Sequence, residues 1–185
     1  MAKHPIEKHF GLTAKEILDA IDARFRLKVA VGGAIAEVQM EKHIAALPAG
    51  VIKKYEAHDI DGHPDFSIFL KGRAAPILLE CKNVRNEAYK LGGEVVNYRV
   101  EVQKTRASKD DPTSRYYGFD QFHILGVCLG NQTGDWTNFM FIRTSDLPPH
   151  GVHSNKIQIM NRVPLLNGDL GNWSTNLADI VRKFE

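Results

Sequence analysis

Two short apolar segments, residues 64–70 (PDFSIFL) and 77–82 (ILLECK), constrain the fold of this chain more than any other feature. Both are rich in β-branched, aromatic and aliphatic residues, and the break between them contains a glycine, which predicts a β-hairpin. Because side chains alternate along a strand, Glu80 and Lys82 lie on the same face of the second strand. Folding the chain back in the break then brings Asp65 opposite them. The hairpin therefore gathers two carboxylates and an amine.

Two neighbouring carboxylates repel one another, so this arrangement needs a positive partner. Mg²⁺ fits, because it takes one or two carboxylates together with waters and phosphate oxygens. The predicted metal ligands are Asp65, Glu80 and the backbone carbonyl of Cys81. Lys82 would lie beside the metal, where its charge could orient or help deprotonate an attacking water and stabilise charge on a phosphate. The alternative is an exposed edge hairpin with a surface Glu–Lys pair.

Pro64-Asp65, followed by Glu80-Cys81-Lys82, resembles the PD-(D/E)xK motif of the restriction-endonuclease-like nucleases. The resemblance implies that Asp65 and Glu80 bind the metal and that Lys82 is the motif lysine. It also implies an α/β fold with a central mixed β-sheet flanked by helices, Mg²⁺ as the cofactor and double-stranded DNA as the substrate.

Two helices are expected before the hairpin. The first runs over about residues 13–25, where Thr13 and Glu16 form a capping-box pattern and apolar residues follow at helical spacing. The second runs over about residues 29–47 and is stopped by proline and glycine. On this helix Glu37 is similar to the acidic residue that many PD-(D/E)xK nucleases contribute to the metal site. A solvated helix glutamate is the alternative.

The segment after the hairpin is ambiguous. We expect a helix over part of residues 94–106, because the sheet needs a crossover to its next parallel strand, although the alternation over residues 96–102 also fits a strand. On a helix, Gln103 and Arg106 would share one face. Similar nucleases place a glutamine or a basic residue there, near the phosphate or the attacking water, and Gln103 is the better match.

Residues 104–120 form the longest stretch without clear periodicity, and they are the best candidate for contacting DNA. Basic, hydroxyl and tyrosine side chains supply hydrogen bonds to phosphates and base edges. The candidate DNA-binding residues are Lys104, Arg106, Lys109, Arg115, Tyr116 and Tyr117. The alternative is a solvated loop closed by Asp-Pro turn chemistry.

Further elements complete the predicted fold. Strands are expected over residues 51–60, 122–129 and 136–143, and the continuous apolar run of the second is typical of a strand buried on both faces. A short terminal helix should follow the capping candidate Ser174. Residues 1–11 read as a polar lead-in, and residues 148–172 as irregular.

Composition is compatible with one globular domain over residues 1–185, with its core at roughly residues 29–143. The 24 basic and 22 acidic residues leave a net charge of +2, so a basic surface would have to be local. Two cysteines imply no disulfide framework, and the eight histidines favour surface or loop roles. The sequence has no signal-like or membrane-spanning segment, so we expect a cytoplasmic protein without a membrane partner.

The favoured function is a Mg²⁺-dependent endonuclease that hydrolyses double-stranded DNA, most similar to a type II restriction endonuclease or its catalytic domain. Cutting both strands would require a homodimer or two sequential nicks, and the sequence does not choose between them. One alternative is a repair, recombination or modification-dependent nuclease of the same fold. The others are a non-cleaving DNA-binding domain and an unrelated α/β binding module in which the motif is a coincidence.

Overall fold

A computed structural model describes residues 3–60, 62–105 and 107–185 of the chain. The chain divides into two compact units, a first unit of residues 1–35 and a second unit of residues 36–185. The single nuclease domain expected over the whole chain stays a prediction. No helix among the described residues has the length and hydropathy needed to cross a bilayer. The cytoplasmic location also stays a prediction.

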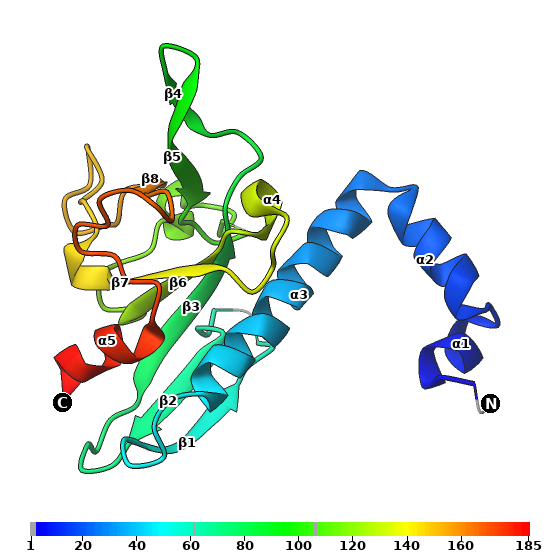
Figure 1. Ribbon diagram of the computed structural model, residues 1–185, viewed down its shortest axis with the longest axis horizontal. Helices are drawn as coiled ribbons and strands as arrows, with labels where there is room; N and C mark the ends of the chain where they lie inside the picture. Colours follow the sequence, from blue (N-terminus) through cyan, green and yellow to red (C-terminus); the bar gives the residue numbers. More distant parts are fainter. Residues whose placement is uncertain (1–2, 61, 106) are drawn as a thin grey trace. The chain divides into compact units, whose positions relative to one another are not determined.

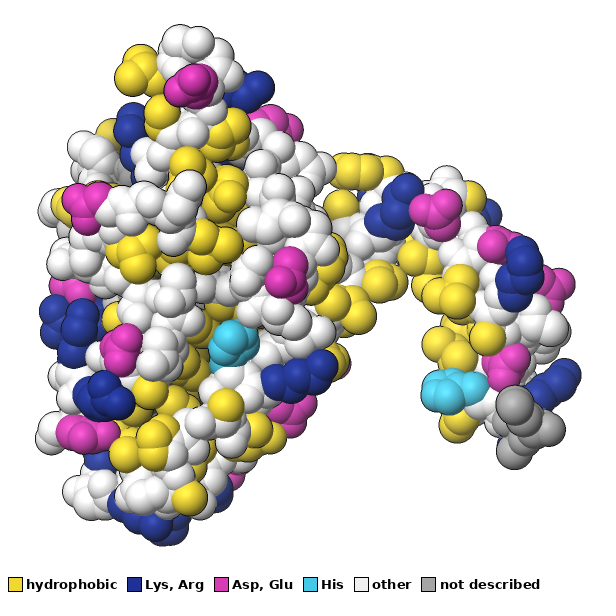
Figure 2. All heavy atoms as spheres, viewed as in Figure 1, with side chains coloured by type: hydrophobic (Ala, Val, Ile, Leu, Met, Phe, Trp, Pro, Cys, Tyr) yellow, Lys and Arg dark blue, Asp and Glu magenta, His cyan; other side chains and the backbone are white. Residues whose placement is uncertain are grey.

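The first unit contains α1 (Pro5–Phe10), α2 (Ala14–Asp22) and the first part of α3 (Phe25–Ala45). The predicted capping box is confirmed, because the Glu16 backbone N–H donates to the Thr13 hydroxyl and the Glu16 carboxylate accepts from the Thr13 backbone. No residue of α1 or α2 is buried. Hydrophobic side chains therefore remain at the surface of this unit (Figure 2).

Two expectations for the N-terminal part of the chain are corrected. The prediction of a polar lead-in over residues 1–11 is wrong, because part of this segment forms α1. His4 caps this helix, and Pro5 occupies its first position, where the fixed φ of proline suits a helix. The helix expected from residue 29 begins at Phe25. The pair Gly32-Gly33 lies inside α3, so the helix continues through it despite the low helix propensity of glycine.

The second unit is built around a five-stranded mixed sheet with the strand order β1-β2-β3-β6-β7 (Figure 1). The strands are β1 (Ile52–Ala57), β2 (Phe66–Leu70), β3 (Ile77–Asn83), β6 (Ile124–Cys128) and β7 (Phe139–Arg143). Strands β3 and β6 are parallel, and the other neighbours are antiparallel. The predicted hairpin and the central mixed sheet with flanking helices are confirmed. A restriction-endonuclease-like core stays a prediction.

Helices cover one face of this sheet. Met40 and Ile44 of α3 and the terminal helix α5 (Leu177–Val181) pack with Leu79 and other apolar side chains of the strands. Gly126 of β6 makes the approach of α3 possible, because a Cβ built there would lie 2.1 Å from the Met40 Cε atom. The second half of α3 is therefore held against the sheet.

A second sheet, with the order β4-β5-β8, covers the other face. Its strands are β4 (Tyr89–Leu91), β5 (Glu94–Glu101) and β8 (Met160–Val163), and all its pairs are antiparallel. The helix expected over part of residues 94–106 is therefore wrong. Gly92 and Gly93, with φ of 59° and 93°, form the turn of a β4–β5 hairpin, and burial of Val100 and Val102 fixes the strand.

The remaining short elements also refine the prediction. Strand β8 lies within the segment that was expected to be irregular, and α5 is capped by Asn176 in place of Ser174, because the Asn176 side chain accepts from the Ala178 N–H at 3.0 Å. The other short helices are α4 (Gly130–Thr133) and the 3-10 helices η1 (Pro112–Arg115), η2 (Thr144–Asp146) and η3 (Arg182–Phe184).

Candidate active site

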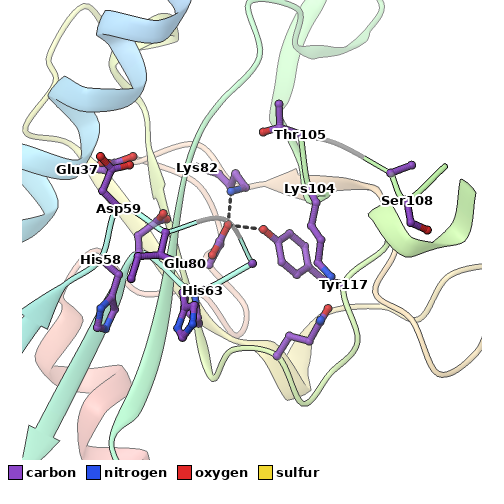
Figure 3. Close-up of a pocket in the computed structure, with 16 residues that line it drawn as sticks. Glu37, His58, Asp59, His63, Glu80, Lys82, Lys104, Thr105, Ser108 and Tyr117 are labelled. Atoms are coloured by element: carbon purple, nitrogen blue, oxygen red, sulfur yellow. Dashed lines mark hydrogen bonds and ion pairs between the residues drawn. The ribbon is translucent and has the colours of Figure 1, made fainter. Parts of the chain in front are cut away.

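A pocket of about 500 Å³ lies where the Asp65 end of the β2–β3 hairpin meets α3 and the segment after β5 (Figure 3). Four residues predicted as catalytic line this pocket, namely Glu37, Asp65, Glu80 and Lys82. In Figure 3, Glu80 and Lys82 lie between Glu37 on one side and Lys104 on the other. The fold therefore brings together most of the site that the sequence predicts.

Asp65 and Glu80 are neighbours across the hairpin. Phe66 pairs with Leu79 in the antiparallel register, so the preceding Asp65 lies next to Glu80. The Asp65 Oδ2 atom accepts a hydrogen bond from the Cys81 backbone N–H at 2.6 Å. Burial, and then repulsion from Glu80, raise the pKa of Asp65 to about 7. The carboxyl groups of Asp65 and Glu80 are therefore neighbours with little access to water, and the strand alternation predicts that they lie close together.

Glu80 is held by two donors. Only 3% of this residue is exposed, and its Oε1 atom contacts the Lys82 ammonium and accepts from the Tyr117 hydroxyl at 2.6 Å. Burial alone would lower the pKa of Lys82, but the Glu80 and Asp65 carboxylates outweigh it, and the pKa is raised. Lys82 is therefore a fixed positive charge at neutral pH, which narrows its expected role to orienting water and stabilising phosphate charge.

Tyr117, predicted to contact DNA, lies in the pocket instead of on an open loop. Its ring centroid is 5.7 Å from the Lys82 Nζ atom and 5.6 Å from the Lys104 Nζ atom, and the ring packs edge-on against Phe122. Burial, followed by the charge of Glu80, raises the pKa of the Tyr117 hydroxyl, so it remains a hydrogen-bond donor. The tyrosine therefore fixes the orientation of the Glu80 carboxylate.

Replacing Tyr117 by phenylalanine should lower the free energy of unfolding by about 1.5–3 kcal/mol, because a buried carboxylate loses a charge-assisted hydrogen bond. Urea unfolding checks this value. Tyr116→Phe is the matched control, since the Tyr116 ring stacks on His150 and phenylalanine keeps the ring. Equal stability of the two variants would show that the Tyr117 hydroxyl does not hold Glu80.

Glu37 reaches the pocket from α3. Its pKa is raised by burial and by the charges of Asp59 and Glu80, against an opposing effect of Lys82. The carboxylate therefore belongs to the same electrostatic cluster as the hairpin residues. Its placement depends on the close contact of α3 with Gly126, which the sequence alone does not reveal.

Sequence reasoning missed one side of the pocket, formed by His58, Asp59 and His63. The His58 ring hydrogen-bonds the Ser67 hydroxyl at 2.9 Å, and its backbone N–H donates to the Asp65 carbonyl at 2.8 Å. The sequence contained a signal for this, because His58 and Asp59 lie at the end of the strand predicted over residues 51–60. An antiparallel pairing of that strand with the hairpin would have placed them beside Asp65.

The other residues predicted to contact DNA or phosphate occupy different positions. Lys104 lines the pocket, whereas Gln103 does not, because it lies on extended chain that bridges Tyr116 and its amide contacts Glu101. Lys109 is exposed on a turn. Arg115 forms a hydrogen bond within its own segment, because its Nε atom donates to the Lys104 carbonyl at 3.1 Å. Arg106 lies outside the described residues.

The carboxylate pair fits a hard cation. Among the described residues, no three His, Cys, Asp or Glu side chains form a group that could hold a metal ion. Mg²⁺ needs fewer, because waters and substrate oxygens complete its octahedron. Asp65 and Glu80 supply two oxygen donors whose mutual repulsion a cation would relieve. The Cys81 side chain points into the core, so only its backbone is available as a ligand.

Comparisons with known protein families, curated proteins and solved structures found no match for this chain. The functional argument therefore depends on the chemistry of the site itself. The resemblance to the PD-(D/E)xK nucleases stays a prediction based on Pro64-Asp65 and Glu80-Cys81-Lys82.

Proposed function

We propose that this chain is a Mg²⁺-dependent endonuclease that hydrolyses phosphodiester bonds of double-stranded DNA, as a restriction endonuclease does. The observation that carries the proposal is the grouping of Asp65, Glu80 and Lys82 at one end of the hairpin, open to a pocket. Carboxylates that face a pocket repel a phosphate unless a cation lies between them. A metal-dependent reaction on a phosphate ester would explain why two carboxylates, Asp65 and Glu80, lie together at this pocket.

Each pocket residue has a proposed role. Asp65 and Glu80, with the Cys81 carbonyl, would bind Mg²⁺, which when bound acts as a Lewis acid toward water and phosphate. Lys82 would orient the attacking water and stabilise the negative charge that grows on the phosphate. Glu37, with its raised pKa, would accept the proton of that water. Attack on phosphorus breaks the bond to the 3′ oxygen and leaves a 5′ phosphate and a 3′ hydroxyl.

Incubation with plasmid DNA tests this proposal. We expect nicked and linear DNA with Mg²⁺, intact DNA with EDTA, and loss of cleavage in Asp65→Ala. Asp179→Asn is the control, since Asp179 is an exposed acid outside the pocket that pairs with Arg182. DNA that is retarded but uncut would favour the non-cleaving DNA-binding domain, and no binding at low salt would contradict both proposals. A fixed fragment pattern would favour restriction over repair, recombination or modification-dependent cleavage.

We also propose that the first unit forms a homodimer with a second copy. Helices of six and nine residues are marginal in water unless their apolar faces are covered. Nine of the sixteen exposed large apolar side chains among the described residues lie in this unit: Ile6, Phe10, Leu12, Leu18, Phe25, Leu27, Val29, Val31 and Ile35. A standard interface buries roughly 800 Å² per partner, and these side chains would supply its apolar part. A twofold dimer would supply two copies of the site, one for each DNA strand.

Leu18→Glu should convert this dimer into a monomer, because a charge would be buried at the interface. Leu18 is 63% exposed, so the substitution should leave the fold of one chain unchanged. Sedimentation equilibrium measures the mass, and Val152→Glu, at a position that is 81% exposed in the second unit, is the control. A wild-type monomer at micromolar concentration would contradict the dimer.

A further inference from the structure

Two arginines face each other directly on the second sheet. Arg99 of β5 pairs with Arg162 of β8 in the antiparallel register. Like charges at directly opposed positions destabilise a sheet. Both guanidinium groups lie over the ring of Tyr89, at 4.9 Å for Arg99 and 4.7 Å for Arg162. The tyrosine relieves the repulsion in part, and the sheet keeps a concentrated positive charge (β4, β5 and β8 in Figure 1).

The nearby acids already have other partners. Glu87 and Glu101 form ion pairs with Arg85, and the second oxygen of Glu101 contacts the Gln103 amide. Glu87 also interacts electrostatically with Arg99 at longer range. Within the described part of the chain, no carboxylate forms an ion pair with Arg99 or Arg162. The Arg99 Nε atom is buried and has no hydrogen-bond acceptor there. Among the described residues, neither guanidinium group is therefore neutralised by a direct ion pair.

The arginine pair lies along the same chain segment as the pocket. Val84, two residues after Lys82, bridges to Val100, so Arg99 lies beside the end of β3. From Arg99 the chain runs through β5 to Lys104, which lines the pocket. Five residues of extended chain span at most roughly 17 Å, which is about five base pairs of one DNA strand. Arg99 therefore lies no farther from Lys104 than the length of about five base pairs.

We propose that Arg99 and Arg162 bind backbone phosphates of the DNA whose scissile phosphate occupies the pocket. The planar guanidinium group matches two phosphate oxygens at once, and it keeps its charge at any pH at which DNA is bound. This inference rests on the proposed function, and it assigns the second sheet to substrate binding. Residues 104–120, the DNA-contact segment expected from the sequence, then supply the contacts nearer the reacting phosphate.

The salt dependence of DNA binding tests this assignment. Affinity for a short duplex is measured at several salt concentrations with Ca²⁺ in place of Mg²⁺. Each lost phosphate contact should reduce the slope of log affinity against log salt by about 0.9. The Arg99→Gln/Arg162→Gln variant should therefore lose about 1.8 from the slope and bind roughly tenfold to a hundredfold more weakly at moderate salt.

Two further variants make the result specific. Arg182→Gln/Lys183→Gln removes the same charge from η3 and should keep the wild-type slope. Arg99→Lys/Arg162→Lys keeps the charge and should restore most of the slope. If the wild type cleaves DNA but the Arg99→Gln/Arg162→Gln variant keeps its slope, or the η3 control loses as much, the inference is overturned and the proposed function stands. If the wild type neither binds nor cleaves DNA, both are overturned.

Discussion

Replacing Asp65 by asparagine is expected to abolish Mg²⁺-dependent cleavage and, at the same time, to stabilise the metal-free protein at neutral pH. Burial and the Glu80 carboxylate raise the pKa of Asp65 from 3.8 to about 7. The folded protein therefore holds this proton more tightly than the unfolded chain. Its free energy of unfolding falls as the pH rises from about 4 to about 7, because the buried carboxyl must ionise beside Glu80. Asparagine still accepts the Cys81 N–H and never ionises.

The expected gain is on the order of 1–3 kcal/mol at pH 8, and it should vanish below pH 4, where aspartate is protonated in both states. Urea unfolding at several pH values in EDTA measures it. Asp179→Asn, an exposed acid paired with Arg182, is the control and should show no such gain. Added Mg²⁺ should stabilise the wild type and leave Asp65→Asn unchanged. Loss of stability at pH 8, or retained cleavage, would contradict this account of the pair.

Lys82→Met should produce the second large effect. Among the described residues, Glu80 would keep the Tyr117 hydroxyl as its donor, and the loss of one partner of a buried ion pair costs about 3–5 kcal/mol. Cleavage should fall by about 10²–10³, because a fixed charge near the phosphate is lost. Mg²⁺ should bind at least as tightly as before, since the ammonium no longer competes for Glu80.

Thermal unfolding with EDTA and with Mg²⁺ checks this prediction. Mg²⁺ should restore much of the stability of Lys82→Met, and Glu80→Gln/Lys82→Met should regain stability without metal because it removes both charges. Lys104→Met is the matched control, since the Lys104 ammonium lies near the same tyrosine ring, whereas the ion pair with Glu80 is made by Lys82. If Lys82→Met were as stable as the wild type in EDTA, the ion pair between Lys82 and Glu80 would contribute little to the stability of the fold.

Local patterns predicted the parts of the fold that depend on neighbouring residues. The alternation in residues 77–82 and the apolar run in residues 122–129 gave the hairpin and β6, and the Thr13 and Glu16 pattern gave the start of α2. The β4-β5-β8 sheet was missed because β5 is fixed by β8, about sixty residues later in the chain. We expected a helix over part of residues 94–106 as a crossover between parallel strands. The pairing with β8 stabilises a strand there instead.

The residues of the candidate site also divide into those placed by local patterns and those placed by tertiary contacts. Strand alternation and the hairpin turn were enough to place Asp65, Glu80 and Lys82 together. The resemblance, and not the geometry, pointed to Glu37, which reaches the pocket through the packing of α3. His58 required the register of β1 with β2, which the sequence left open. Gln103 was assigned through the helix that does not form.

Diffraction from crystals soaked in Mn²⁺, a stand-in for Mg²⁺ with an anomalous signal, tests the central claim most directly. The claim is that the two hairpin carboxylates share a divalent cation. We expect an anomalous peak about 2.1 Å from oxygens of Asp65 and Glu80, and its loss in Asp65→Asn. A map with no peak there, with the Lys82 ammonium still on Glu80, would contradict it.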